Sequence, residues 1–322
     1  MQIRILSAAD VRTALPMPKA IEAMRHAYGQ LSAGKVDAPP RQHIATDKGV
    51  TLLMPAHLPE HSEFGIKVVS VYDDNPNLNL PRITATVLVL DPATGLPKAF
   101  MDGSSLTAIR TGAGAGVAAD VLARQDAKTV GLFGAGVQAR TQLQAVLAVR
   151  KIAHVNLISR TKASAQQLAT EISEGVDAPE VNLASTPQQV VEDADIVICA
   201  TTSATPLFDG KALRPGTHIT AVGTFVPEKR EVDTTTIRRA SRIVVDSREA
   251  CLEEAGDLII PKAEIDAEIG EIVNGDKQGR QSDHEITFFK SVGVAVQDAV
   301  AGSVVLAEAE AKGLGTIVEM AL

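Results

Sequence analysis

The chain has 322 residues, 45% of them hydrophobic, and a formal net charge of −8 at pH 7. A single domain usually takes about 100 to 200 residues, so this length favours two domains. The negative charge argues against nucleic acids and anionic membranes as partners, because both attract clusters of Lys and Arg.

The sequence also argues against export, membrane insertion and metal binding. Arg4 interrupts the first apolar run, which therefore lacks the apolar centre of a signal peptide. No apolar run approaches roughly 18 residues, the length needed to cross a membrane. Cys199 and Cys251 have no metal-binding spacing, and the seven histidines form no zinc pattern. We therefore expect a cytoplasmic protein without a membrane span or a metal site.

Residues 1–100 have the pattern of an α+β segment. A helix is expected over residues 17–34, where apolar residues recur at helical spacing and a glycine closes the run. Strands are expected over residues 62–75 and, as a pair joined by a turn, over residues 83–103.

After Lys128 the pattern changes to alternating strands and helices. The expected strands lie within residues 129–136, 154–159, 194–201, 218–223 and 242–247. Several buried strands separated by helices predict a parallel, doubly wound α/β sheet. A long helical pattern over residues 291–315 is expected to return to the first domain.

The stretch TVGLFGAGVQAR carries a dinucleotide-binding motif. Gly134, Gly136 and Ala139 fit the pattern G-x-G-x-x-A, with a strand before them and a helix after them. Gly134 permits the tight turn, Gly136 lets the backbone approach a pyrophosphate, and the helix N-terminus then faces the anion. A second glycine run, RTGAGAG, lies in a helical stretch rich in Ala, and we interpret its glycines as close helix packing.

The end of the next strand, LISRTKAS, indicates which nucleotide is bound. NAD-selective sites hold the ribose 2′-OH with Asp or Glu at this point, whereas this chain has Ser159, Arg160 and Thr161. Arg160 can pair with a 2′-phosphate, and the two hydroxyls can donate hydrogen bonds to it. We therefore predict NADPH as the preferred cofactor and NADH as the second. The alternative is that Arg160 is only a solvated turn residue.

Three basic residues stand out in the first segment, where strands should bury apolar side chains. Lys67 interrupts FGIKVVSV, Arg41 follows DAPP, and Arg110 lies in SSLTAIRTGAGAG. Each alone is more often an exposed charge. Together they predict a site for a small carboxylate, which Arg binds with two hydrogen bonds and Lys with a point charge.

At these residues the sequence resembles the ornithine cyclodeaminase/mu-crystallin family, and within it the ketimine reductases. The matching stretches include GIKVVSVYDDNPNLNLP, VLVLDPATGLPKAFMDGSSLTAIRTGAGAGVAADVLA, VVDSREACLEEAGDL and ITFFKSVGVAVQD. The resemblance implies a homodimer in which a substrate-binding and dimerisation domain, residues 1–120 plus 304–322, accompanies a Rossmann domain, residues 121–303.

The resemblance also implies roles for individual residues. Lys67, Arg41 and Arg110 match the family's substrate-binding basic residues. The positions that match its cofactor site are Gly134, Gly136, Val137, Gln138, Ser159, Arg160, Thr161, Thr201, Thr202, Val222, Gly223 and Ser291. The remaining pocket residues are expected to be Thr224, Phe225 and Val292.

The loop after the strand HITAV departs from the family pattern. Cyclodeaminases and the archaeal alanine dehydrogenase of the family have Asp two residues before the loop proline, where this chain has Phe225. A cyclodeaminase uses that Asp to move protons, so its absence removes a general acid/base. A preformed cyclic imine needs no such group, because it is readily protonated near neutral pH.

We therefore expect an NAD(P)H-dependent imine reductase of cyclic ketimine carboxylates. Δ1-Pyrroline-2-carboxylate, giving L-proline, is the first substrate expected, and Δ1-piperideine-2-carboxylate, giving L-pipecolate, the second. Alanine dehydrogenase and ornithine cyclodeaminase remain alternatives if Asp298 or Asp257 lies near enough to replace the missing acid. A non-catalytic NADPH-binding protein is a more remote alternative. Such a protein would lose the basic cluster, whereas Arg41, Lys67 and Arg110 are all present here.

Overall fold

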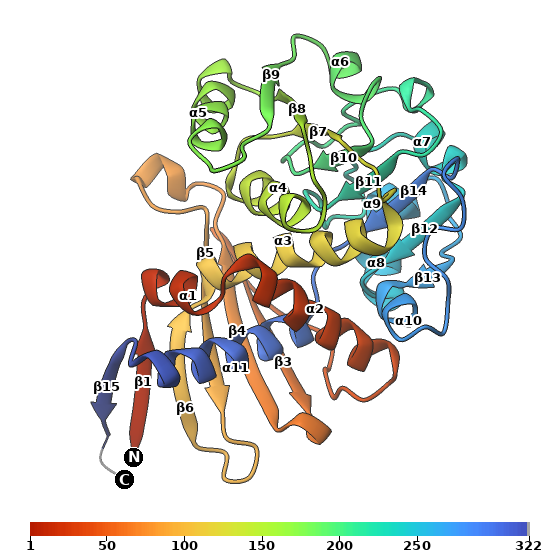
Figure 1. The fold of residues 1–322 in the computed structure, drawn as a ribbon. Helices are drawn as coiled ribbons and strands as arrows, with labels where there is room; N and C mark the ends of the chain where they lie inside the picture. The colour runs from red at the N-terminus through yellow and green to blue at the C-terminus, as the bar shows by residue number, and fades with distance from the viewer. Residues whose placement is uncertain (321–322) are drawn as a thin grey trace. The chain divides into compact units, whose positions relative to one another are not determined.

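The computed structural model describes residues 1–320, and its contacts divide the chain into two compact units. The first unit is Met1–Arg110 together with the chain from Val294 onward, and the second is Thr111–Gly293. Figure 1 shows the elements of both. The expected domain boundaries, 120/121 and 303/304, fall inside two long helices, α3 (Gly103–Leu122) and α11 (Ala295–Lys312).

The first unit contains a mixed sheet with helices packed on one face. The sheet has the order β15-β1-β6-β5-β4-β3-β2. Its strands are β1 (Gln2–Leu6), β2 (Gln42–Thr46), β3 (Gly49–Leu58), β4 (Glu63–Val71), β5 (Ile83–Leu90), β6 (Pro97–Asp102) and β15 (Thr316–Glu319). The packed helices are α1 (Ala8–Ala14), α2 (Met17–Ser32) and α11. Helix α11 thus joins the two chain ends in one unit, as the pattern over residues 291–315 predicted.

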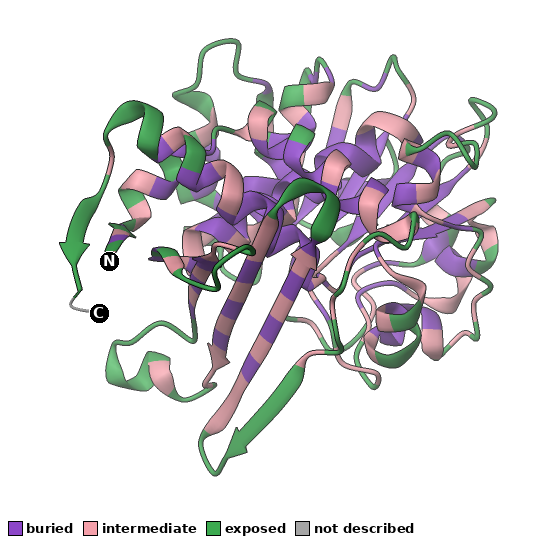
Figure 2. Ribbon diagram, turned by 90° about the horizontal axis from the view of Figure 1, so that it is seen from below, coloured by how far each residue is buried: buried purple, intermediate pink, exposed green. Residues whose placement is uncertain are grey.

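The two faces of this sheet differ in burial. Buried and partly exposed residues alternate along β3 and β4, as the period of a strand requires, and Figure 2 shows the alternation as stripes. On the face away from α11, strand pairing aligns Pro55, Ile66, Leu88 and Phe100 in one row. Phe100 is 41% exposed. This face is therefore apolar and incompletely covered within the unit.

The second unit has a parallel sheet of order β13-β12-β14-β11-β10-β7-β8-β9. Its strands are β7 (Thr129–Phe133), β8 (His154–Ile158), β9 (Glu180–Leu183), β10 (Ile196–Cys199), β11 (His218–Ala221), β12 (Arg242–Val245), β13 (Ala267–Glu268) and β14 (Thr287–Lys290). The chain runs outward from β7 to β9, then returns to β10 on the other side of β7. The carboxyl ends of β7 and β10 therefore form the switch point at which such sheets bind ligands.

Helices cover both faces of this sheet. The bounds of these helices are α4 (Val137–Val149), α5 (Lys162–Ser173), α6 (Pro187–Val191), α7 (Thr234–Arg239), α8 (Arg248–Glu254), α9 (Gly256–Ile259) and α10 (Ile269–Val273). Helices α4 and α5 contribute to one apolar core, and α6 to α9 to the other. Cys199 and Cys251 are fully buried in the second core. The predicted doubly wound Rossmann sheet with a second α+β domain is confirmed.

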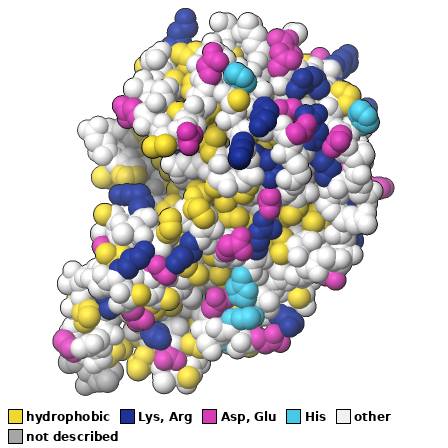
Figure 3. Space-filling model, in the orientation of Figure 1, with side chains coloured by type: hydrophobic (Ala, Val, Ile, Leu, Met, Phe, Trp, Pro, Cys, Tyr) yellow, Lys and Arg dark blue, Asp and Glu magenta, His cyan; other side chains and the backbone are white. Residues whose placement is uncertain are grey.

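Basic and acidic side chains are interspersed on the face that Figure 3 draws. In residues 1–320 we find no helix long and apolar enough to cross a membrane.

Candidate active site

The three predicted basic residues belong to the first unit, where two of them meet a buried carboxylate. Lys67 on β4 is only 2% exposed, and its Nζ lies 2.7 Å from Oδ2 of Asp298. Arg110 on α3 is 4% exposed, and its Nε donates to Oδ1 of the same carboxylate at 3.0 Å. Asp298 therefore bridges two cations that lie far from it in the sequence.

The first turn of α11 holds this arrangement in place. Gln297 accepts a hydrogen bond from Nη1 of Arg110 at 2.7 Å and donates one to the Tyr28 hydroxyl at 2.7 Å. The Gln297 side chain also accepts from the backbone N–H of Val294, at the start of the helix. The guanidinium of Arg110 is thus fixed by two adjacent residues of one helix.

Burial and the neighbouring cations lower the pKa of Lys67. Burial is the largest cause, and the positive charge of Arg110 adds to it, while Asp298 opposes both; the resulting pKa is about 8. Arg41 also lowers the pKa of Lys67, which places its charge within electrostatic reach, and it is half-buried. Lys67 and Arg110 against the single carboxylate of Asp298 leave a net positive charge. Such a site can accept one further carboxylate.

The glycine loop of the second unit follows β7, at the switch point of the sheet. Gly134 has a φ of +106°, and a Cβ there would lie 2.5 Å from the carbonyl oxygen of Ala200. Gly136 is the exposed N-cap of α4, with no side-chain cap, and a Cβ there would meet nothing within 4 Å. Val137 is 64% exposed and Gln138 half-buried. The free space and the uncapped helix N-terminus fit a phosphate group.

The second glycine run is packing, as predicted. A Cβ on Gly112 would lie 2.5 Å from the carbonyl oxygen of Thr141 on α4. This approach of α3 to α4 leaves no room for a phosphate.

The turn after β8 presents the residues predicted to read the ribose. Arg160 is exposed and Ser159 half-buried. Thr161 is the N-cap of α5, where its Oγ1 accepts from the backbone N–H of Ser164 at 3.3 Å. Arg160 is therefore accessible to a phosphate group, while Thr161 also caps helix α5.

The predicted residues after β10, β11 and β14 divide into exposed and buried ones. Phe225 is 38% exposed, Thr202 is exposed, and Val222, Gly223 and Val292 are half-buried. Thr224 and Ser291 are buried, and their hydroxyls donate to Asp257 at 3.1 Å and Asp246 at 2.7 Å. Thr201 donates to Glu231 at 2.7 Å. The hydroxyl groups in these loops thus bind buried carboxylates.

Most of these buried charges were not predicted from the sequence. Glu231, Asp246 and Lys290 were not singled out, although a lysine at the end of the apolar run ITFFK was a signal. Asp257 was considered only as a replacement acid. Its Oδ1 accepts from the backbone N–H groups of Glu231 and Val232, and its Oδ2 from Lys290 and Thr224. This carboxylate is fully buried and both of its oxygens already accept hydrogen bonds, so it is not positioned as a general acid.

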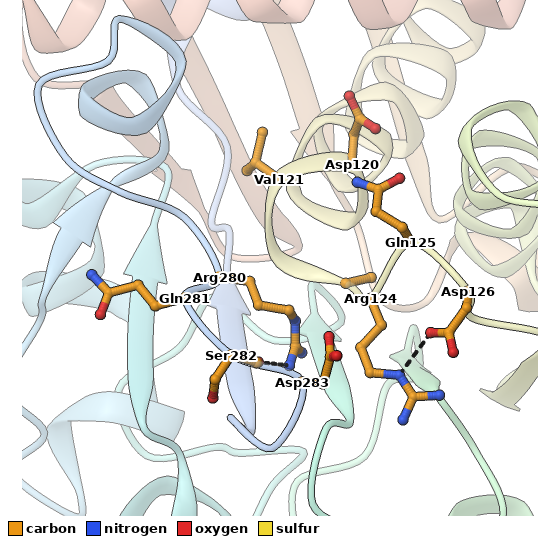
Figure 4. A pocket seen from close by; sticks show the side chains of 10 residues that line it. Asp120, Val121, Arg124, Gln125, Asp126, Arg280, Gln281, Ser282 and Asp283 are labelled. Carbon is orange, nitrogen blue, oxygen red and sulfur yellow. Dashed lines mark hydrogen bonds and ion pairs between the residues drawn. The ribbon is translucent and has the colours of Figure 1, made fainter.

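A cleft in the second unit is lined by Asp120, Arg124, Arg280 and Asp283, among others (Figure 4). Arg280 already donates to backbone carbonyls, among them those of Leu122 and Gly216. Arg124 donates to two carboxylates. These arginines hold the loops together and do not form a candidate anion site. Among the described residues, we also find no group of three or more His, Cys, Asp or Glu side chains arranged for a metal ion.

Comparison with known proteins agrees with the resemblance seen in the sequence. The model of the ornithine cyclodeaminase/mu-crystallin family matches residues 1–313. The chain belongs to this family. It is 37% identical to a Δ1-pyrroline-2-carboxylate reductase of Bacillus cereus, covering 98% of this chain and 99% of the relative.

Solved structures of family members have the same fold. The Thermococcus litoralis Δ1-pyrroline-2-carboxylate reductase in complex with NADH and L-proline superposes with a TM-score of 0.93 at 40% identity, covering 98% of this chain and 99% of that one. An archaeal alanine dehydrogenase dimer with bound NAD gives a TM-score of 0.93 at 31% identity, covering 99% of both chains. The prediction of an oxidoreductase of this family is confirmed.

The glycine loop yields a test of the nucleotide site that does not depend on the substrate. We expect Gly136→Val to weaken NADPH and NADH binding at least about tenfold with little change in melting temperature, because the added side chain enters only the phosphate space. Gly134→Ala should instead lower the melting temperature by several degrees. Alanine would have to adopt the positive φ of this position, and its Cβ would clash with the carbonyl oxygen of Ala200. Calorimetric titration and thermal unfolding of both variants measure this. Unchanged nucleotide affinity in Gly136→Val would contradict the phosphate assignment.

Proposed function

We propose that this enzyme reduces cyclic ketimine carboxylates with a nicotinamide cofactor, converting Δ1-pyrroline-2-carboxylate to L-proline and, as a second substrate, Δ1-piperideine-2-carboxylate to L-pipecolate. The buried cluster of Lys67, Arg110 and Asp298, with Arg41 close by, is the observation that carries the proposal. The relatives named as reductases of the first of these imines support it.

The basic cluster suits the carboxylate of such a substrate. A buried site with net positive charge binds a carboxylate strongly, because few water molecules compete for it. Arg110 is already oriented by Asp298 and Gln297, so little side-chain entropy is lost on binding. We assign Arg110 and Arg41 to the substrate carboxylate.

Lys67 is the residue we assign to the imine nitrogen. Its pKa of about 8 keeps it largely protonated at neutral pH but ready to give up a proton. Asp298, 2.7 Å away, stabilises the charged form. When bound, the nicotinamide supplies the hydride to C2 of the ring. Reduction then needs one proton on nitrogen, which Lys67 holds or the protonated imine already carries.

The corner after β11 fits a reaction that needs no further acid. Phe225 stands in place of the Asp of cyclodeaminases, and its 38% exposed ring can form a wall for an apolar substrate ring. Asp257, the replacement considered from the sequence, is fully hydrogen-bonded in the interior. No acid stands among residues 223–227, where cyclodeaminases have Asp, and this favours a preformed imine over amine oxidation followed by ring closure.

We also propose that NADPH is preferred over NADH. The support is the exposed Arg160 and the lack of a carboxylate in the turn after β8. This preference is independent of the imine reaction, since it concerns only the 2′ position of the ribose.

Alanine dehydrogenase is the second candidate, and one observation favours it. Asp298 is as buried and ion-paired as Asp257, but one of its partners is Lys67, so it can influence proton transfer through that lysine. The archaeal alanine dehydrogenase has the same fold. Ornithine cyclodeaminase has no comparable support, and the intact basic cluster disfavours a non-catalytic nucleotide-binding protein.

A direct assay separates these candidates. We expect cofactor oxidation at 340 nm with Δ1-pyrroline-2-carboxylate to have a kcat/KM at least about a hundredfold above that with pyruvate plus ammonia, because the imine is preformed. The kcat/KM with NADPH as cofactor should be at least about tenfold higher than with NADH. Lys67→Met should remove most of the activity with either imine. Comparable rates with pyruvate plus ammonia would overturn the imine assignment and favour alanine dehydrogenase.

The pKa of Lys67 predicts how reduction depends on pH. Since the protonated form is the active one, kcat/KM should fall above about pH 8, tenfold per pH unit. Asp298 raises the pKa of Lys67, so Asp298→Asn should move this fall to lower pH. The matched control is Asp73→Asn, which breaks the exposed pair with Arg82. An unchanged pH profile in Asp298→Asn would contradict the role of Lys67.

We propose, in addition, that a second copy of the chain covers the apolar sheet face of the first unit. The row of Pro55, Ile66, Leu88 and Phe100 supports this, as does the dimer of the archaeal relative. Exposed apolar patches of this kind mark protein interfaces.

Phe100→Asp should therefore yield a monomer in sedimentation or light scattering, because a charge would be buried in the interface. Leu78→Asp, at a 68% exposed apolar residue outside the row, is the control and should keep the assembly of the parent. A parent protein that is monomeric at micromolar concentration would contradict the dimer.

A further inference from the structure

A buried cluster of charged side chains lies at the carboxyl ends of three strands of the second unit. Glu231, Asp257 and Lys290 are each fully buried. Lys290, the last residue of β14, donates from Nζ to Oδ2 of Asp257 at 2.6 Å and to the backbone carbonyl of Thr224 at 2.7 Å. These contacts join β14 to the loop after β11.

Glu231 links the loops that follow two adjacent strands. Its Oε1 accepts from both the backbone N–H and the hydroxyl of Thr201, after β10, at 2.7 Å each. Its Oε2 accepts from the backbone N–H of Gly223, after β11, at 2.7 Å. All three groups donate hydrogen bonds to Glu231, so the ionised carboxylate fits this environment better than the neutral acid. One side chain thus sets the spacing of two loops.

The cluster carries an excess negative charge. Glu231 and Asp257 contribute two negative charges and Lys290 one positive charge. Burial raises the pKa of Glu231, whereas Lys290 and the donors from Thr201 oppose that rise. The loops that Glu231 holds lie at the carboxyl edge of the sheet, where a Rossmann fold binds its cofactor. A nicotinamide ring is cationic when oxidised and neutral when reduced.

We propose that Glu231 is the positioning residue of the nicotinamide end of the cofactor site, where its fixed carboxylate orders the loops after β10 and β11 and favours the oxidised cofactor over the reduced one. The inference rests on the proposed cofactor site but not on the identity of the imine. A buried carboxylate of purely structural importance would affect both redox forms of the cofactor equally.

The test is to titrate the wild type and Glu231→Gln with NADP⁺, NADPH, NAD⁺ and NADH by calorimetry. The amide keeps the size of the side chain but removes the charge and turns one N–H toward the backbone donors. We expect the dissociation constant of each oxidised form to rise about tenfold more than that of the reduced form, the effect of a unit charge acting over about 12 Å at an effective dielectric constant of about 20.

Asp195→Asn is the matched control, at the opposite edge of the same sheet. The carboxylate of Asp195 is also buried and also accepts two backbone N–H groups, those of Lys128 and Thr129. This variant should lose stability but keep the ratio of the dissociation constants for the oxidised and reduced forms. The same ratio in Glu231→Gln as in the wild type would overturn the electrostatic role.

Glu231→Asp keeps the proposal testable if the amide variant does not fold. The shorter acid keeps the charge but cannot reach both loops, so both forms should bind more weakly by the same factor. Wild-type affinity in Glu231→Asp would overturn the positioning role. A wild type that binds none of the four nucleotides would instead overturn the proposed function, and this inference with it.

Discussion

The first unit depends on one buried carboxylate, that of Asp298, which lies between Lys67 and Arg110. Burying two cations without a counter-charge is strongly unfavourable, and removing one partner of such a pair typically costs about 3 to 5 kcal/mol. Asp298 therefore permits two basic side chains to stand in the interior of the unit. Because it neutralises only part of their charge, the cluster keeps the capacity to bind an anion. The stability of the unit and the proposed binding of the substrate carboxylate thus rest on the same contact.

The second unit uses buried carboxylates for a different purpose. Asp246, Asp257 and Glu231 each accept backbone N–H groups from loops at the carboxyl edge of the parallel sheet. Such bonds are charge-assisted and stronger than neutral ones, so they hold these loops in place. Asp246 accepts hydrogen bonds from the Ser291 hydroxyl and from the backbone N–H groups of Val292 and Gly293, where the chain leaves this unit. A rigid edge of this kind suits a fold that must present its backbone to a dinucleotide.

Local sequence patterns predicted much of this structure. The features that they did not predict depend on contacts between residues far apart in the sequence. The glycine turn at Gly134 was readable because strand, turn and helix follow one another directly. The division between the two units was not readable, because its first point falls within α3, where the helical pattern continues without a break. Asp298 could not be placed beside Arg110, since 188 positions separate them and nothing local marks the pair. Glu231 was missed for the same reason, as its partners lie in loops whose proximity only the sheet order creates.

We propose above all that the buried basic cluster binds the carboxylate of a cyclic imine. The most direct measurement compares Δ1-pyrroline-2-carboxylate with 1-pyrroline, which has the same ring and the same C=N bond but no carboxylate. Loss of a buried, charge-paired partner typically costs about 2 to 5 kcal/mol, so kcat/KM should be at least about thirtyfold lower for 1-pyrroline. Equal values of kcat/KM for the two imines would show that Lys67, Arg41 and Arg110 do not recognise the carboxylate, and would contradict the account.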